Sequence, residues 1–154
     1  MRFVTSLQRF MIPMAVAFCV SSASAQTRDV KTEEANKKLV VAFYQSFFGD
    51  HDLSSAEKYL APSYIQHNPG LPDGRDALVN MAKGLFASAP KGKADIRRVA
   101  ADGDLVWLHV RGQFGPGPAS SVVDIFRVKD GKIVEHWDTI QAIPEKSANP
   151  HPMF

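Results

Sequence analysis

Alternation of apolar and polar residues is clearest near the C-terminus, where residues 124–138 read DIFRVKDGKIVEHWD. The alternation runs on both sides of Lys129-Asp130-Gly131. A glycine at the end of this tripeptide can adopt the left-handed conformation that a three-residue hairpin loop requires. The pattern therefore predicts a β-hairpin with a three-residue loop.

The loop length decides which side chains of this hairpin share a face, because side chains alternate along a strand and directly paired residues lie on the same side. A three-residue loop pairs Val128 with Lys132 and Asp124 with His136. One face is then expected to carry Asp124, Phe126, Val134, His136 and Asp138, and the other Ile125, Arg127, Ile133, Glu135 and Trp137. An even loop would reverse this assignment. Two carboxylates and an imidazole among apolar side chains indicate either a solvated face or the wall of a pocket.

Helical spacing dominates the first half of the chain. Apolar residues three and four positions apart predict an amphipathic helix from about residue 30 to 48, closed by Gly49. Ser54 and Glu57 match a capping box, which predicts a short helix through residue 60 that ends before proline. An extended segment at residues 64–68 leads into a turn, and a third helical pattern follows residue 74 and stops near residue 90.

The second half of the chain is rich in β patterns. Strands are expected over residues 94–100 and 105–111, followed by the hairpin, with a break at residues 115–118. Because strands follow helices, the expected fold class is α+β, with one domain over residues 26–143. Residues 144–154, which include two prolines, are expected to form an irregular tail.

The chain begins with a pattern typical of an export signal. Arg2 and Arg9 precede an apolar run of about 11 residues, and small residues lead to an Ala-x-Ala site ending at Ala25. The run is shorter than the roughly 20 residues that span a bilayer, although an uncleaved anchor is the alternative. Cys19 follows a bulky residue, so lipid attachment is not expected. We therefore expect residues 1–25 to be a cleaved secretory signal peptide and the mature protein to be periplasmic or secreted, without membrane attachment.

Removal of this segment changes the charge balance. Without Arg2 and Arg9, 16 of the 18 lysines and arginines remain, against 16 aspartates and glutamates. A formally neutral mature chain gives no reason to expect a nucleic-acid partner. The mature sequence also lacks cysteine, so its roughly 129 residues must rely on one hydrophobic core without disulfides.

Two motifs give the chain a family resemblance. The order of three helices and then strands, with YIQHNP at residues 64–69 and the hairpin sequence near the end, resembles the SnoaL-like branch of the NTF2-like superfamily over residues 34–143. The resemblance implies a cone in which a curved, mainly antiparallel sheet wraps about three N-terminal helices around a ligand pocket. It also implies a homodimer formed through the sheet.

The same resemblance assigns roles to individual residues. In polyketide cyclases of this type an aspartate on the last long strand is the acid/base group of an intramolecular aldol closure, which implies that role for Asp138. Asp124 would be a polar pocket residue on the neighbouring strand, and His67 would line the cavity. Export does not suit an enzyme of cytoplasmic polyketide intermediates, so a related pocket that acts on another compound is expected. The superfamily also includes isomerases, dehydratases, epoxide hydrolases and members without catalysis.

Each candidate also has a structural interpretation. An apolar environment disfavours a charged carboxylate, which suits Asp138 to proton exchange with a carbon acid, and His136 could relay the proton. Alternatively, Asp124, His136 and Asp138 form an ion-pair network that fixes the hairpin. His67 either polarises a substrate carbonyl or is satisfied by the backbone of a turn, and Asn68 is expected to be a turn residue.

Other positions are expected to serve packing. Trp107 and His109 share one face of the 105–111 strand, and the pattern does not decide which face of this strand points inward. Trp137 is expected on the outer face or in a subunit contact, and Arg127 is expected to pair with an acid such as Glu135. A metal could in principle use His67, His109, Asp124, His136 and Asp138, but their spacing matches no recognised ligand pattern, and no metal or other cofactor is expected.

These observations lead to one main hypothesis and two rivals. The main hypothesis is an exported, cofactor-free enzyme that uses Asp138 for aldol, isomerase or dehydratase chemistry on a small hydrophobic carbonyl compound, with His67, Asp124 and His136 in support. The first rival is a binding module or dimeric accessory protein. The second is a purely structural dimer with a filled cavity.

Overall fold

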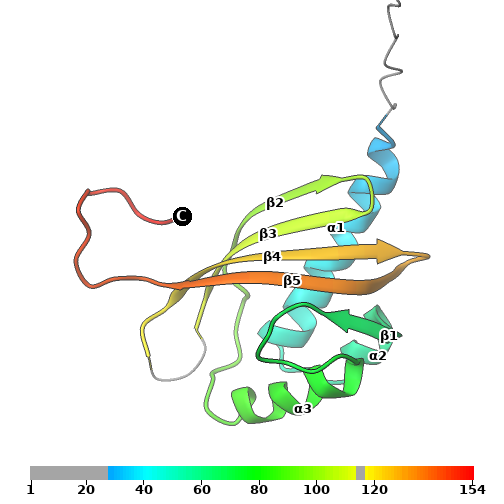
Figure 1. The fold of residues 1–154 in the computed structure, drawn as a ribbon, viewed down its shortest axis with the longest axis horizontal. Coiled ribbons are helices and arrows are strands. Elements are labelled where there is room, and N and C mark those ends of the chain that lie inside the picture. Colours follow the sequence, from blue (N-terminus) through cyan, green and yellow to red (C-terminus); the bar gives the residue numbers. More distant parts are fainter. Residues whose placement is uncertain (1–27, 114–116) are drawn as a thin grey trace, which may run out of the picture.

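A computed structural model describes residues 28–113 and 117–154 of the chain (Figure 1). Helices come first and strands follow, as the sequence pattern predicts. The elements are α1 (Val30–Tyr44), a π-helical segment η1 (Gln45–Gly49), α2 (Ser55–Tyr59), β1 (Leu60–Gln66), α3 (Arg75–Phe86), β2 (Ile96–Asp102), β3 (Leu105–Gly112), β4 (Ser120–Lys129) and β5 (Lys132–Ala142). The predicted signal peptide, residues 1–25, lies outside the described residues.

The strands form one mixed sheet in the order β1-β5-β4-β3-β2. Strands β2 to β5 are antiparallel neighbours, whereas β1 pairs with β5 in parallel. The α+β class and the mainly antiparallel sheet are therefore confirmed. The strand β1 begins at Leu60, earlier than the extended segment predicted from residue 64, and its last residue, Gln66, lies beside His136.

The core fills the space between the helices and one face of the sheet. Figure 1 shows α1 running across this face, with α2 and α3 gathered near β1. Aromatic side chains dominate the contact: Phe43 of α1 lies 5.4 Å from Phe47 and 6.1 Å from Phe126, measured between ring centroids. Phe126 is 2 % exposed, so the hairpin strand β4 is anchored directly on α1. The face of β4 and β5 that carries Phe126 therefore points toward the helices, and we call it the inner face.

The first helix ends differently from its prediction. The expected helix to residue 48 is regular only to Tyr44, after which five residues form a π-helical turn that ends at Gly49. The backbone N–H of Asp50 donates to the carbonyl of Gln45, five residues back. Gly49 permits this turn because a Cβ there would lie 2.3 Å from Nε2 of Gln45 and 2.7 Å from the carbonyl oxygen of Gly92.

The predicted capping box at α2 is wrong. The hydroxyl of Ser54 caps no backbone N–H of the helix and instead donates to Oδ1 of Asp52, at 2.6 Å. The carboxylate of Asp52 also accepts the backbone N–H of Ser54. Asp52, and not the predicted pair of Ser54 and Glu57, therefore provides the side-chain hydrogen bonds just before α2.

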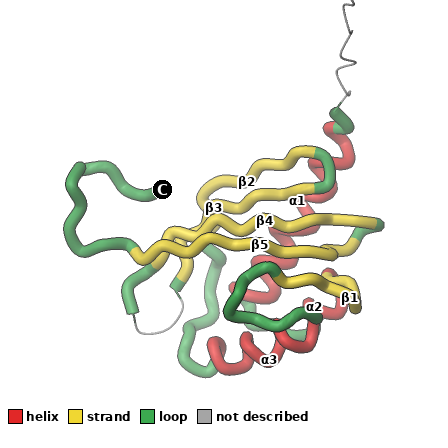
Figure 2. The backbone as a smooth tube through the Cα atoms, viewed as in Figure 1, coloured by secondary structure: helices red, strands yellow, loops and turns green. Residues whose placement is uncertain are grey.

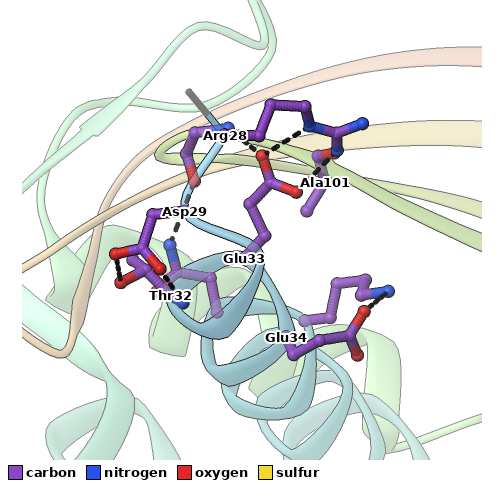
Figure 3. A network of polar contacts seen from close by, with 9 residues as sticks. Arg28, Asp29, Thr32, Glu33, Glu34 and Ala101 are labelled. Carbon is purple, nitrogen blue, oxygen red and sulfur yellow. Dashed lines mark hydrogen bonds and ion pairs between the residues drawn. The ribbon is translucent and has the colours of Figure 1, made fainter. Parts of the chain in front are cut away.

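A polar network ties the start of α1 to the turn between β2 and β3 (Figure 3). Glu33, which is 4 % exposed, accepts hydrogen bonds from Arg28 at 2.6 Å and from the backbone N–H of Gly103 at 3.0 Å. Arg28 also donates to the carbonyl of Ala101. The Arg28 hydrogen bond, with that of Gly103, holds the pKa of Glu33 below its usual value. A buried carboxylate without such donors would be unfavourable.

The hairpin differs from its prediction in register but not in the face of its polar residues. Lys129 pairs with Lys132, so the loop has two residues, and both Asp130 and Gly131 have positive φ as a type I′ turn requires. A bulge follows, because Val128 pairs with Ile133 but the next pair is Arg127 with Glu135. Relative to the predicted three-residue loop, the two-residue loop places the side chains of β5 on the opposite faces of the sheet. The extra residue in the bulge reverses them again, so the residues beyond the bulge lie on the predicted faces.

The bulge explains which side-chain predictions hold. Asp124, rather than pairing with His136, lies directly opposite Asp138. Ile133 is fully buried on the inner side, so its predicted outward position, and the inward position of Val134, are wrong. Beyond the bulge, Asp124, His136 and Asp138 share the inner face, as predicted.

The C-terminal tail contains no helix or strand in residues 144–154. In Figures 1 and 2 it leaves the end of β5, extends away from the sheet and turns back. Its last residue, Phe154, lies against His109 and the guanidinium of Arg97, each 5.3 Å from the ring centroid. Among the described residues, no helix is long and apolar enough to cross a membrane.

Candidate functional site

A cavity of about 260 Å³ lies between the inner face of the sheet and the helices. Its apolar wall comes mainly from α1, η1 and α3, and its polar residues come from β1, β4, β5 and the segment after β1. The lining consists of Tyr44, Phe48, Gln66, Asn68, Gly70, Leu71, Leu78, Met81, Leu85, Val122, Asp124, His136, Asp138 and Ile140. An apolar hollow with a few convergent polar groups is typical of a small-molecule site.

Asp138 is a half-buried carboxylate held by one amide. Nδ2 of Asn68 lies 2.8 Å from Oδ1 and 2.9 Å from Oδ2 of Asp138. Oδ1 of Asn68 accepts the backbone N–H of Gly70 at 2.8 Å, which fixes the orientation of the amide. Asn68 is therefore a turn residue, as predicted, and also a direct partner of the candidate acid/base group.

Asp124 and His136 form a buried pair beside this carboxylate. Their exposed fractions are 5 % and 7 %, and Nε2 of His136 lies 3.0 Å from Oδ1 of Asp124. The other ring nitrogen of His136 lies 2.9 Å from Oε1 of Gln66. Among the described residues, Oδ2 of Asp124 has no hydrogen-bond partner.

Two buried tyrosines complete the polar surroundings. Burial raises the pKa of Tyr44 well above its usual value, and the charge of Asp124 raises it further. The pKa of Tyr64 is also raised, by burial first and then by the charges of Asp124 and Asp138. Both phenols therefore keep their protons at neutral pH and can act only as neutral hydroxyl groups.

His67 does not line this cavity, contrary to the expectation from the sequence. Its ring stacks on Trp137, with 4.4 Å between centroids and 3° between planes, and its Nε2 lies 3.4 Å from the carboxylate of Glu135. Both partners belong to the face of β5 that points away from the helices. The reason is local alternation: Gln66 points inward beside His136, so the next residue points outward.

The structure also assigns the remaining candidates. Val106, Leu108 and Val110 are the buried residues of β3, so Trp107 and His109 lie on the outer face. Trp137 lies on the same side of the sheet, and Arg127 contacts Asp104 at 2.7 Å and Glu135 at 3.5 Å. His67 and His109 are therefore separate from the cavity. Of the five residues considered for a metal, Asp124, His136 and Asp138 come together, with ligand atoms within 4.8 Å of one another.

Three residues of the site are not found by sequence reasoning. Gln66 and Asn68 belong to the YIQHNP segment, in which the histidine draws attention before the two amides. The parallel pairing of β1 with β5 brings them to the site, and no local pattern predicts that pairing. Tyr44 follows the helical repeat, so it is indistinguishable from a core residue until the cavity is seen.

The chain belongs to the SnoaL-like domain family, whose pattern it matches over residues 40–136. Among curated proteins, none matches this sequence. Solved structures share its fold at low sequence identity, and they include NTF2-like proteins. One from Burkholderia xenovorans LB400, an NTF2-like protein of unknown function, is 18 % identical, with a TM-score of 0.61 over 75 % of this chain and 90 % of that one.

Two further structures carry functional descriptions of their own. A candidate SnoaL-like polyketide cyclase from Jannaschia sp. CCS1 is 20 % identical, with a TM-score of 0.60 over 75 % of this chain and 90 % of that protein. AclR, a candidate hydroxylase from Streptomyces galilaeus, is 23 % identical, with a TM-score of 0.61 over 73 % and 82 % of the two chains. At these sequence identities the similarity establishes the fold alone. The three proteins share this fold although their functional descriptions differ.

Proposed function

We propose that this protein is an exported acid/base enzyme that acts on a small hydrophobic carbonyl compound. The observation that carries the proposal is the position of Asp138, a half-buried carboxylate in the wall of a largely apolar cavity of about 260 Å³. A carboxylate in such a place can take a proton from a carbon atom beside a carbonyl group and return it elsewhere. Aldol closure, isomerisation and elimination all begin with this step.

The composition of the cavity supports an uncharged substrate. Its lining contains two aspartates and a histidine and includes no lysine or arginine among the described residues. An anionic ligand would meet carboxylates without a compensating cation, which is unfavourable in an apolar environment. The hydroxyl of Tyr44, which keeps its proton, lies beside Asp124 and adds an uncharged polar group to the cavity wall.

The experiment measures proton exchange directly, so it does not require the natural reaction to be known. The mature protein is incubated in D₂O with a panel of small aromatic and aliphatic ketones and diketones, and deuterium incorporation beside the carbonyl is followed by NMR. We expect exchange with the wild type and at least a hundredfold less with Asp138→Asn, in line with the usual contribution of a general base. Asp130→Asn is the matched control, because Asp130 is exposed in the hairpin turn and has a positive φ that asparagine also accepts. Retained exchange in Asp138→Asn would exclude this residue as the base.

A binding module is the second candidate, and one observation favours it. Asn68 donates to both oxygens of Asp138, so the carboxylate is already engaged before any ligand arrives. Under this proposal, ketones raise the melting temperature of the wild type and of Asp138→Asn alike, and no exchange or product appears with either. The exposed side chain of Val123 on the outer face supports a homodimer through the sheet in both proposals.

A further inference from the structure

The amide of Gln66 has a fixed orientation. Its Oε1 lies 3.0 Å from the backbone nitrogen of Asn68, and that nitrogen can only donate. If the amide were flipped, two N–H groups would face each other, so the oxygen must occupy this position. The same oxygen lies 2.9 Å from Nδ1 of His136. Because an amide oxygen only accepts, Nδ1 of His136 must carry a hydrogen.

The other nitrogen of the ring then meets a carboxylate. A neutral imidazole with hydrogen on Nδ1 has a lone pair on Nε2, and Nε2 lies 3.0 Å from Oδ1 of Asp124. Both residues are buried, so water cannot separate the lone pair from the carboxylate oxygen. Such a contact is repulsive unless a proton lies between the two atoms.

We propose that Gln66 is a positioning residue that fixes the tautomer of His136, so that the His136–Asp124 pair keeps one shared proton at neutral pH and Asp138 is the base. The pair then has no net charge, whether the proton is closer to nitrogen or to oxygen. This inference rests on the proposed function in one respect, namely that Asp138 is the group that accepts the substrate proton.

The neighbours of the pair are consistent with this arrangement. From α1 the phenol of Tyr44 faces it, and from β1 the phenol of Tyr64, whose raised pKa keeps it neutral. The ring of Phe126 lies 4.7 Å from that of His136 and excludes water from one side. Asp138 is the remaining charged neighbour in the described lining of the cavity.

The shared proton also changes the relation between the two carboxylates. Asp124 and Asp138 lie directly opposite each other on adjacent strands, where two negative charges would destabilise the sheet. With the proton in place, one negative charge remains, on the carboxylate that Asn68 supports. The base and the neutral pair are thus distinguished by their amide partners, Asn68 for Asp138 and Gln66 for His136.

The test is NMR spectroscopy of protein labelled with ¹⁵N histidine and ¹³C aspartate, at about pH 7.5, roughly one unit above the value of a free imidazole. His136→Gln and Asp124→Asn identify the relevant signals. Two ring protons on His136, or one on Nδ1 together with a protonated Asp124 carboxyl group, support the proposal. A neutral ring with its proton on Nε2 overturns it. So does a neutral Nδ1–H ring beside an ionised Asp124, since a cation other than a proton would then be needed between them.

Variants of Gln66 test the positioning role. Gln66→Leu removes the acceptor, so we expect His136 to lose one ring proton at the same pH and to donate from Nε2 to an ionised Asp124. Gln66→Glu keeps an acceptor for Nδ1 and should retain the shared proton. If Gln66→Leu folds and His136 keeps the same ring protons as in the wild type, the role of Gln66 is overturned. If Gln66→Leu does not fold, loss of the shared proton in Gln66→Glu overturns that role. These measurements need no substrate, so their outcome does not depend on whether the proposed enzymatic function is correct.

Discussion

Asp124 and Asp138 are paired directly across β4 and β5, yet each carboxylate is held by a different partner, His136 for the first and Asn68 for the second. The two acids are therefore chemically unequal although they occupy matching positions in the sheet. Asp124 is buried with its histidine, whereas Asp138 is half-buried in the cavity wall. Unequal surroundings of this kind allow one carboxylate to react while the other maintains the structure.

Asn68→Asp should impair the reacting carboxylate without breaking the turn. The new side chain can still accept the backbone N–H of Gly70, but it places a second acid where Asp138 now finds a donor. Two carboxyl groups at hydrogen-bond distance tend to share one proton, which occupies the base, so we expect deuterium exchange to fall roughly tenfold or more. Asn80→Asp on the exposed side of α3 is the matched control. Equal exchange rates for wild type and Asn68→Asp would contradict the role given to Asn68.

His67→Ala should leave the exchange rate unchanged. The ring of His67 stacks on Trp137 outside the cavity, so its removal deletes a surface contact and no cavity group. We expect a loss of stability of about 1 kcal/mol or less in urea unfolding. A large decrease of exchange in a fully folded variant would instead restore the catalytic role that the sequence alone indicates.

Gly49→Ala should destabilise the protein. A Cβ at this position would lie 2.7 Å from the carbonyl oxygen of Gly92, a backbone atom that cannot retreat as a side chain would. We expect the free energy of unfolding to fall by about 1–3 kcal/mol, the usual cost of overpacking. Gly84→Ala in α3 is the control, because a Cβ there meets nothing within 4 Å and should stabilise the helix by up to about 1 kcal/mol. Similar effects of the two changes on urea unfolding would contradict this account.

Glu33 should contribute to stability in a pH-dependent way. Its pKa is lower in the folded protein than in the unfolded chain because Arg28 and the Gly103 N–H favour the charged form. The contribution is therefore complete above the unfolded value of about 4.3 and is lost as the pH falls through the lower folded value. We expect Glu33→Gln to be less stable than wild type near neutral pH, with a difference that shrinks in acid. Urea unfolding at several pH values measures this, and a difference that grows in acid would have the wrong sign.

Much of the architecture follows from local sequence patterns. The α+β class, the positions of three helices and the shared face of Asp124, His136 and Asp138 are all predicted correctly. The prediction of that face is correct only because two departures from the predicted hairpin compensate each other. The loop at Asp130 has two residues where three were predicted, and a bulge follows it. The bulge depends on contacts distant in sequence: Ile133 packs in the core and Lys132 donates to carbonyl groups of α2.

The remaining part of the site depends on one pairing between distant segments. Strand β1 joins the edge of β5 in parallel, and no short-range pattern predicts which edge it joins or in what register. That register makes Gln66 an inner residue and His67 an outer one. From the sequence, His67 is the more obvious candidate because histidine often has a catalytic role. In the structure, Gln66 lines the cavity and His67 does not.

The cancellation at the hairpin tip has a consequence for how such chains diverge. Addition or loss of one residue at Asp130-Gly131, or loss of the bulge alone, would reverse the faces of β5 relative to β4 and turn His136 and Asp138 away from the cavity. To keep these acids facing inward, a one-residue change in the length of the tip must be accompanied by gain or loss of the bulge. Otherwise the tip can change in length only by two residues at a time. Homologous hairpins are expected to differ in length by even numbers wherever the inward acids are kept.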